Sequence, residues 1–336
     1  MTEAVTIDDV ARQAGVSRQT VSNVLNAPQV VRESTRQRVM QAVEQLGYSP
    51  NSSARRLRTR RSSTIGVRLD AYAGGISGVV LDRFVHALTE RAGARRLRVL
   101  LYAARTPEDE ISRWDELMRG GDVDAVVISG TFHGDPRTGW LLGRGLPFVS
   151  FGRPWGADDI DDPAHLWVDV DGAAGTRAAT THALETAGPR VAFLGWPTGS
   201  GTGDDRERGW RETIGPRAGS ASAPRWAVQE GIAEARELVG RELARHEIDA
   251  LVCASDSLAV GAHLAAADLG RPHLPIVGFD NTPVVEALGL SSVEQLPEQV
   301  AAAAIDLITG PGGEIEARAA TPGAAHALIV PRLIVR

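Results

Sequence analysis

"TIDDVARQAGVSRQTVSNVLN" (residues 6–26) decides the fold of the amino-terminal part of the chain. Its apolar residues recur at helical spacing in two separate groups. We predict one helix over 7–14, in which Thr6 and Asp9 form a capping box. A second helix should start after Ser17, a good N-cap, and run to about Leu25. Only three residues, with Gly15 ending the first helix, lie between them, so the stretch has the spacing of a helix-turn-helix.

The second predicted helix carries a polar face that contains no carboxylate. Arg18, Gln19, Ser22 and Asn23 lie on this face, and no acidic residue occurs between Gly15 and Asn26. An arginine can bind guanine through two hydrogen bonds, and glutamine or asparagine can bind adenine in the same way. The pattern favours a helix that lies in the major groove of DNA. An ordinary surface helix of a helical bundle is the alternative that the motif leaves open.

A third helix is predicted over 33–46, and the polar segment 48–63, "YSPNSSARRLRTRRSS", follows it. This segment holds five arginines, and Leu57 is its one sizeable aliphatic residue. A short helix over 51–57 is not stable alone in water, so we expect it to form only against a partner. Leu57 suits an apolar wedge in a minor groove, with arginines on the flanking phosphates. A flexible linker with one accidental leucine is the alternative.

Charge is distributed unevenly along the chain. Residues 1–61 hold 10 arginines and 5 acidic residues, a net charge of +5, whereas the remainder carries −11. This asymmetry predicts that the amino-terminal part alone binds a polyanion. All 36 basic residues are arginine, which excludes sites that need a lysine, such as a phosphate-binding P-loop or a Schiff base.

Other features narrow the class of protein. A chain of 336 residues suggests two or three domains, and its apolar runs are too short to span a bilayer. The amino-terminal residues lack the pattern of a signal peptide, and the single Cys253 excludes an internal disulfide. The eight histidines are scattered, and no nucleophile motif is present, so we expect neither a metal, a cofactor nor an enzyme.

From Ile65 onward, apolar segments alternate with helical ones, which predicts parallel sheets covered on both faces. About 270 residues exceed one ordinary sheet, so two lobes are expected, with ligands at the carboxyl ends of the strands. The glycine-rich segment 195–205 departs from a dinucleotide loop because Asp204 stands at the third small position. The predicted strands are "IGVRL" at 65, "RVLLY" at 98, "AVVIS" at 125, "PFVSF" at 147, "VAFLG" at 191, "ALVCAS" at 250 and "PIVGF" at 275.

With these motifs in place, the sequence resembles the lactose-repressor/galactose-repressor family of bacterial transcription regulators. "VTIDDVARQAGVSRQTVSNVLN" and "GYSPNSSARRLRTRRSSTIGV" match that family's headpiece and hinge, and "CASDSLAVGA" and "IVGFDN" match its body. The resemblance implies an all-α helix-turn-helix headpiece plus an α/β two-lobed, periplasmic-binding-protein-like body with parallel sheets. The implied parts are the headpiece (1–49), the hinge helix and linker (50–63) and the body (64–336), in which lobe 1 covers about 64–160 and 292–320 and lobe 2 covers about 161–291 and 321–336.

The resemblance also assigns residues to DNA. Arg18, Gln19 and Asn23 would read bases in the major groove, and Leu57 with Ala54 would enter the minor groove at the centre of a pseudo-palindromic operator. Further residues would hold phosphates or frame the contact, namely Thr6, Ser17, Thr20, Ser22, Asn26, Thr35, Tyr48 and Asn51.

A small effector is implied between the lobes, and a saccharide is the first choice because several tryptophans flank loops, where a ring can stack on a sugar. Gly152 replaces the family's common strand-end aspartate, so Arg153 is expected to take over part of its role. The implied effector-binding residues are Asp70, Ser77, Arg153, Arg206, Ser255, Asp280 and Gln295.

The sequence therefore predicts a cytoplasmic, nucleoid-associated repressor, a homodimer without a tetramer-forming tail, that responds to an effector. A solute-binding protein without a DNA role is the alternative. It would need a signal peptide and would lack residues 1–61.

Overall fold

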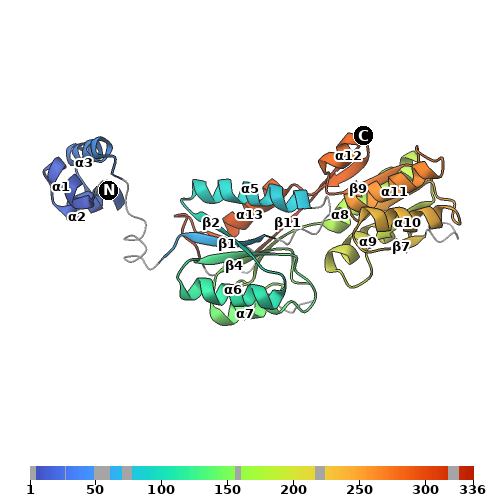
Figure 1. Ribbon diagram of the computed structural model, residues 1–336, viewed down its shortest axis with the longest axis horizontal. Helices are drawn as coiled ribbons and strands as arrows, with labels where there is room; N and C mark the ends of the chain where they lie inside the picture. The colour runs from blue at the N-terminus through green and yellow to red at the C-terminus, as the bar shows by residue number, and fades with distance from the viewer. Residues whose placement is uncertain are drawn as a thin grey trace. The chain divides into compact units, whose positions relative to one another are not determined.

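The computed structural model describes residues 5–26, 28–48, 61–69, 78–155, 160–215, 224–316 and 325–336 (Figure 1). Contacts divide the chain into two units, Met1–Ser62 and Ser63–Arg336. The first unit contains the headpiece and nearly all of the linker, and the second is the body. Within the described ranges, no helix is both long enough and apolar enough to cross a membrane.

Among the described residues of the headpiece, three α-helices and one short 3-10 helix are present. They are α1 (Ile7–Ala14), α2 (Arg18–Asn26), the 3-10 helix (Pro28–Val30) and α3 (Glu33–Leu46). The predicted capping box is present, because Thr6 Oγ1 accepts from the Asp9 N–H and the Asp9 carboxylate accepts from the Thr6 N–H. Gly15 ends α1 in the left-handed region at φ 63°, as the turn requires. One buried residue from each helix, Val10, Val21 and Val39, closes the core.

Lobe 1 of the body contains a six-stranded parallel sheet in the order β11-β5-β4-β3-β1-β2. Helices α5 and α13 cover one face and α6 and α7 the other (Figure 1), each through a separate apolar core. The strands are β1 (Thr64–Leu69), β2 (Arg98–Ala103), β3 (Ala125–Ser129), β4 (Phe148–Phe151), β5 (Leu166–Val170) and β11 (His326–Ile329). The helices are α5 (Gly78–Ala94), α6 (Pro107–Arg119), α7 (Pro136–Arg144) and α13 (Pro297–Ile308).

Lobe 2 contains a second six-stranded sheet in the order β12-β10-β9-β8-β6-β7, in which only β12 is antiparallel to its neighbour. Helix α8 packs against α9, and α10 packs against α11. The strands are β6 (Val191–Gly195), β7 (Arg225–Ala227), β8 (Ala250–Cys253), β9 (Ile276–Phe279), β10 (Ser291–Glu294) and β12 (Arg332–Ile334). The helices are α8 (Gly172–Thr186), α9 (Gly201–Ile214), α10 (Ile232–Leu243), α11 (Asp256–Asp268) and α12 (Pro283–Ala287).

The chain passes between the lobes three times: between β5 and α8, between β10 and α13, and between β11 and β12. The expected lobe boundaries were therefore wrong. Strand β5 belongs to lobe 1 although lobe 2 was expected from 161, β10 belongs to lobe 2, and β11 belongs to lobe 1. Each strand is short and lies next to a crossing, so its apolar pattern does not show which sheet it joins.

The predicted fold class is confirmed, and all seven predicted strands are present as β1, β2, β3, β4, β6, β8 and β9. The hinge helix predicted over 51–57 lies outside the described residues, as do Asn51, Ala54, Leu57, Asp70 and Ser77, to which binding roles were assigned.

Candidate functional site

Helix α2 has two faces, an apolar one that packs in the core and the polar one that was predicted to read bases. Val21 and Val24 are buried in the headpiece core, whereas Arg18 and Gln19 are exposed. The Gln19 amide donates to Asn23 Oδ1 at 2.9 Å, so two of the three predicted base readers contact each other. Arg18 Nη1 lies 3.8 Å from Asp8 of α1, and both side chains are exposed, so this ion pair is weak. All three side chains can therefore rearrange to face a partner.

Hydroxyl side chains lie at the amino-terminal ends of the first two helices. Ser17 Oγ accepts from the Thr20 N–H at 3.1 Å and shares a hydrogen bond with Thr20 Oγ1. Thr6 caps α1 and Ser17 caps α2, so free N–H groups and positive helix-dipole ends occur where phosphates were predicted. Of the other predicted contacts, Ser22, Thr35 and Tyr48 are half-buried, and Asn26 is the last residue of α2.

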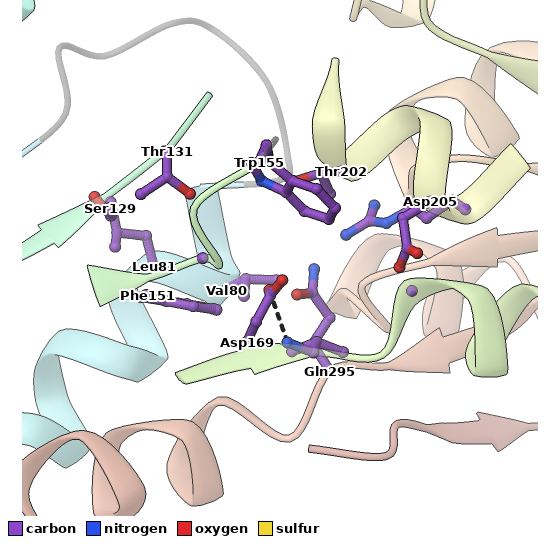
Figure 2. Close-up of a pocket in the computed structure, with 15 residues that line it drawn as sticks. Val80, Leu81, Ser129, Thr131, Phe151, Trp155, Asp169, Thr202, Asp205 and Gln295 are labelled. Atoms are coloured by element: carbon purple, nitrogen blue, oxygen red, sulfur yellow. Dashed lines mark hydrogen bonds between the residues drawn. The ribbon is translucent and has the colours of Figure 1, made fainter. Parts of the chain in front are cut away.

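A cleft of about 300 Å³ lies in the body where the carboxyl ends of the lobe 1 strands face the start of α9 (Figure 2). Both lobes and one crossing segment line it. Its polar residues include Thr131 and Asp169 from lobe 1, Asp205 and Arg206 from α9, and Gln295 from the crossing before α13. Phe151 and Trp155 add aromatic surface from lobe 1. Polar groups converge beside aromatic rings, which is the composition of a small-molecule site.

Arg206 is the most buried cation of the cleft. Its side chain is 6% exposed, and Nη1 donates to the Ala254 carbonyl at 2.5 Å. The guanidinium carbon lies 3.8 Å from the centroid of the Phe279 ring, a cation–π contact. Burial lowers the pKa of Arg206, and neighbouring carboxylates, chiefly Asp280 with Oδ1 at 3.9 Å, oppose that shift. Within the described residues, Nε has no hydrogen-bond partner, which leaves a buried donor for a ligand.

Asp280 follows β9 and faces the same guanidinium. Its backbone lies at φ 124°, a region that L residues rarely adopt, and strain of this kind concentrates at functional sites. The Gln295 amide donates to Asp280 Oδ1 at 2.5 Å. Burial raises the pKa of Asp280 to about 7, although Arg206 lowers it, and Asp256 raises it further. The structure thus brings together three predicted effector-binding residues, Arg206, Asp280 and Gln295.

Arg153 lies beside the cleft and holds two carboxylates. Nε donates to Asp169 Oδ2 at 2.6 Å, and Nη2 lies 3.2 Å from Asp205 Oδ2. Burial raises the pKa of Asp169, and Arg153 opposes that rise. The predicted binding roles did not include Asp169 or Asp205. An aspartate inside the apolar strand "LWVDV" was the available signal for Asp169, because a charge at such a position needs a partner.

Ser255 is not among the cleft-lining residues. It caps α11, and its hydroxyl donates to Glu230 Oε2 at 2.8 Å, a carboxylate that also accepts from the Trp196 indole. Of the tryptophans that flank loops, Trp167 and Trp210 are buried in the lobes and bonded to backbone carbonyls. Trp155 lines the cleft, and Trp196 lies 5.5 Å from the Arg206 guanidinium. Among the residues that the structure describes, no acidic, histidine or cysteine side chains cluster as a metal site would require.

Comparisons with known proteins cover both units. Residues 6–51 match the family model "Bacterial regulatory proteins, lacI family", and 180–336 match the "Periplasmic binding protein-like domain". The chain is 31% identical over 330 residues to the HTH-type transcriptional regulator CelR of Thermobifida fusca, covering 91% of this chain and 92% of CelR.

Two solved structures cover almost the whole chain. A complex of the transcriptional regulator CelR with cellobiose superposes with a TM-score of 0.69 at 26% identity, covering 99% of each chain. The lac repressor dimer bound to operator and an anti-inducer has a TM-score of 0.77 at 22% identity, covering 99% of this chain and 98% of that one, and supports the fold alone.

Proposed function

Because the chain belongs to the lacI family of bacterial regulatory proteins, we propose that it is a homodimeric transcriptional repressor whose affinity for a pseudo-palindromic operator is controlled by a saccharide in the cleft. One observation carries this proposal: the same chain holds an acid-free helix face that suits DNA and a two-lobed cleft that suits a small ligand. Such a protein acts on the nucleoid in the cytoplasm and turns over no substrate.

The headpiece would bind DNA through α2. Arg18 is available for a guanine, and Gln19 and Asn23 would exchange their mutual hydrogen bond for adenine edges. Thr6 and Ser17 lie at helix amino-termini, where N–H groups favour phosphates. Leu57 would then enter the minor groove between the two half-sites.

The body would sense the effector through the relative position of its lobes. Lobe 1 supplies Asp169 and Phe151 to the cleft, and lobe 2 supplies Arg206 and Asp205, so a bound ligand contacts both. A saccharide fits this lining because hydroxyl groups pair with carboxylates and guanidinium groups while a sugar face stacks on an aromatic ring. The cellobiose complex of the CelR relative supports this class of ligand. Differential affinity for two lobe arrangements would shift their populations and with them operator binding.

Selection of duplexes from a random library, followed by affinity titration, tests the DNA role. We expect pseudo-palindromic sites whose binding weakens steeply with salt, because bound phosphates release counterions. Arg18→Ala and Asn23→Ala should relax selectivity at single, different base positions, each at a cost of about 1–3 kcal/mol. Arg12→Ala, an exposed arginine of α1, is the matched control and should leave the selected sequence unchanged. Salt-independent binding, or selection of no palindrome, contradicts the proposal.

Thermal-shift screening of the full chain against saccharides, with cellobiose in the panel, tests the effector role. A binder should raise the melting temperature with concentration, as ligand linkage requires, and should change affinity for the selected duplex. Arg206→Ala should remove both responses and leave duplex binding intact without effector, because Arg206 lies in the body. A saccharide response that persists unchanged in Arg206→Ala contradicts the assignment of the cleft.

A further inference from the structure

The ring of Trp155 lies where the two lobes meet. Trp155 follows β4 in lobe 1, and Gly201 is the first residue of α9 in lobe 2. A Cβ atom built on Gly201 would lie 2.2 Å from Cγ and from Cδ2 of Trp155. The indole therefore covers the α-carbon of Gly201 directly, and no side chain fits between them. This contact requires glycine on one lobe and a flat ring on the other.

Arg153, two residues before Trp155, adds charged contacts between the two lobes. Its guanidinium carbon lies 4.6 Å from the centre of the Trp155 ring, a stacked cation–π arrangement. The same guanidinium bonds Asp169 in its own lobe and Asp205 in lobe 2, and the side chains of all three are 15% exposed or less. Ion pairs this well shielded from water are weakly screened by salt. Ring and guanidinium together bind one loop of lobe 1 to the start of α9.

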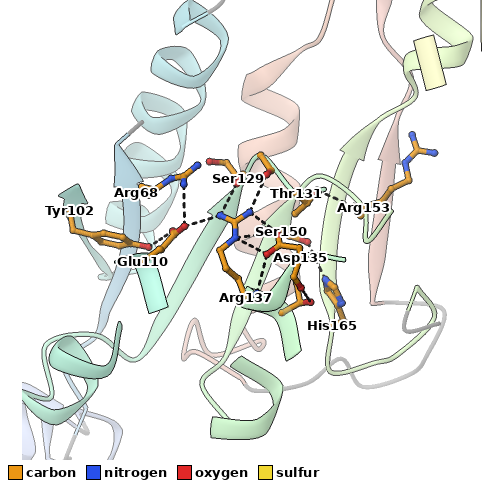
Figure 3. A network of polar contacts seen from close by, with 12 residues as sticks. Arg68, Tyr102, Glu110, Ser129, Thr131, Asp135, Arg137, Ser150, Arg153 and His165 are labelled. Atoms are coloured by element: carbon orange, nitrogen blue, oxygen red, sulfur yellow. Dashed lines mark hydrogen bonds and ion pairs between the residues drawn. The ribbon is translucent and has the colours of Figure 1, made fainter. Parts of the chain in front are cut away.

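The loop that carries both residues is itself held in place (Figure 3). Thr131 Oγ1 donates to the Arg153 carbonyl at 3.0 Å. Gly152 lies at φ 121°, and a Cβ there would lie 2.3 Å from Thr131 Oγ1, so the loop passes Thr131 too closely for any other residue. Arg137, almost fully buried, donates to the Ser129 and Gly130 carbonyls at 3.1 Å and so fixes the turn that holds Thr131.

The polar end of the ring has no role in this packing. Trp155 Nε1 is inaccessible to water and has no acceptor among the residues that the structure describes. Leaving a buried donor unpaired costs free energy, so the contacts of the ring face, and not a hydrogen bond, hold the indole here. Trp155 also lines the cleft, so the residue that covers Gly201 forms part of the wall of the proposed binding site.

We propose that Trp155 and Arg153 are positioning residues that clasp the two lobes together over the cleft when no effector is bound, with Gly201 as the seat of the clasp. The inference rests on the proposed function only for the statement that lobe closure controls operator binding. In effector-free protein the clasp holds the lobes in the closed arrangement. Because the indole fixes the distance between the lobes, an effector must fit the width of the cleft at that distance.

Hydrogen exchange of the full chain, measured by mass spectrometry without DNA or saccharide, tests the clasp. Trp155→Ala should raise exchange severalfold in peptides that cover 200–206, because the first turn of α9 loses its cover. Gly201→Ala should have a similar effect, since its methyl group expels the ring. In the double variant the second change should add nothing, because the ring that clashes is already absent. Trp155→Phe keeps a ring over Gly201 and should restore slow exchange.

A matched control separates the clasp from a general loss of stability. Trp140 of α7 makes the same kind of contact with Arg144, whose guanidinium carbon lies 5.1 Å from its ring, but within lobe 1 alone. Trp140→Ala should leave exchange at 200–206 unchanged. Equal effects of Gly201→Ala with and without Trp155, or unchanged exchange in Trp155→Ala, overturn the proposal. Because neither DNA nor saccharide is present, this result is independent of the tests of the proposed function.

Discussion

Arg206 and Asp280 are a buried pair with little direct contact, and this arrangement suits a binding site more than a structural ion pair. The closest approach between the two side chains is 3.9 Å, while Arg206 donates a short hydrogen bond to the Ala254 carbonyl. Gln295 supplies the hydrogen bond that Asp280 would otherwise take from the arginine. Arg206 can therefore donate, and Asp280 can accept, further hydrogen bonds, and a ligand with hydroxyl groups can bridge the two side chains.

Asp280→Asn should change how stability depends on pH. The pKa of Asp280 is raised to about 7 by burial, above the ordinary value of an aspartate. Between about pH 4 and pH 7 the folded protein holds a proton that the unfolded chain releases, so rising pH destabilises the fold, by at most about 1.4 kcal/mol per pH unit. We expect Asp280→Asn to gain melting temperature relative to the parent from about pH 5 to pH 7 and to level off above. A difference that is constant with pH contradicts the shifted pKa.

At the scale of elements, the position of α9 depends on close backbone contact with α8. A Cβ atom on Gly209 would lie 2.2 Å from the Ala173 carbonyl oxygen, and a backbone atom cannot move aside as a flexible side chain can. Helix α9 carries Asp205 and Arg206 into the cleft, so the glycine that permits this packing also places the site.

Gly209→Ala should therefore lower the free energy of unfolding by about 2 kcal/mol or more, as overpacking does. Gly240 of α10 is the matched control, since within the described part of the chain nothing lies within 4 Å of a Cβ atom there. Gly240→Ala should raise stability by about 0.5–1 kcal/mol through helix propensity alone. Denaturant titration of both variants measures the contrast, and equal effects would show that α8 and α9 are not in close contact.

The sequence predicted those helices and strands whose own residues show a cap, a periodic apolar face or a continuous apolar run. Helices α1 and α3 have caps or a periodic apolar face, and strands such as β3 and β6 are apolar throughout. The short strands β5, β7, β10, β11 and β12 were not predicted. Strand β7 has only three residues, and the apolar residues of β11 are only Ala327, Leu328 and Ile329, so both are too short to carry a complete pattern.

The site was predicted in part, and for a similar reason. Arg206, Asp280 and Gln295 were predicted from resemblance, and the structure brings them together. Asp169 carried a signal that was not used, its position inside an apolar strand. The role of Asp205 and the contact between Trp155 and Gly201 depend on how two lobes approach each other, and a linear pattern does not contain that information. The predicted roles at Leu57 and Asp70 stay predictions.

At the scale of the whole molecule, the separation of charge matters more than the net charge of −6. The first 61 residues carry +5 and the remainder −11, so DNA attracts one part of the chain and repels the other. An acidic body keeps non-specific contacts with DNA confined to the headpiece and the linker.

The full chain should bind heparin at neutral pH despite its negative net charge. Replacing the five linker arginines by glutamine should lower the salt concentration at which it elutes, because fewer counterions are released. These are Arg55, Arg56, Arg58, Arg60 and Arg61. Five exposed body arginines are the control, Arg119, Arg144, Arg236, Arg241 and Arg245, and their replacement should change elution little. Equal shifts in both variants would contradict the separation of charge.

The three passages between the lobes also determine the order in which the protein can mature on the ribosome. The headpiece is complete once its own residues have emerged and can fold early. Lobe 1 must wait for β11 and lobe 2 for β12, so neither sheet is complete until residues 326–334 have been made. A chain released shortly before its end would therefore carry a finished headpiece on two unfinished lobes, and such a product would lack the completed lobes between which the proposed effector binds.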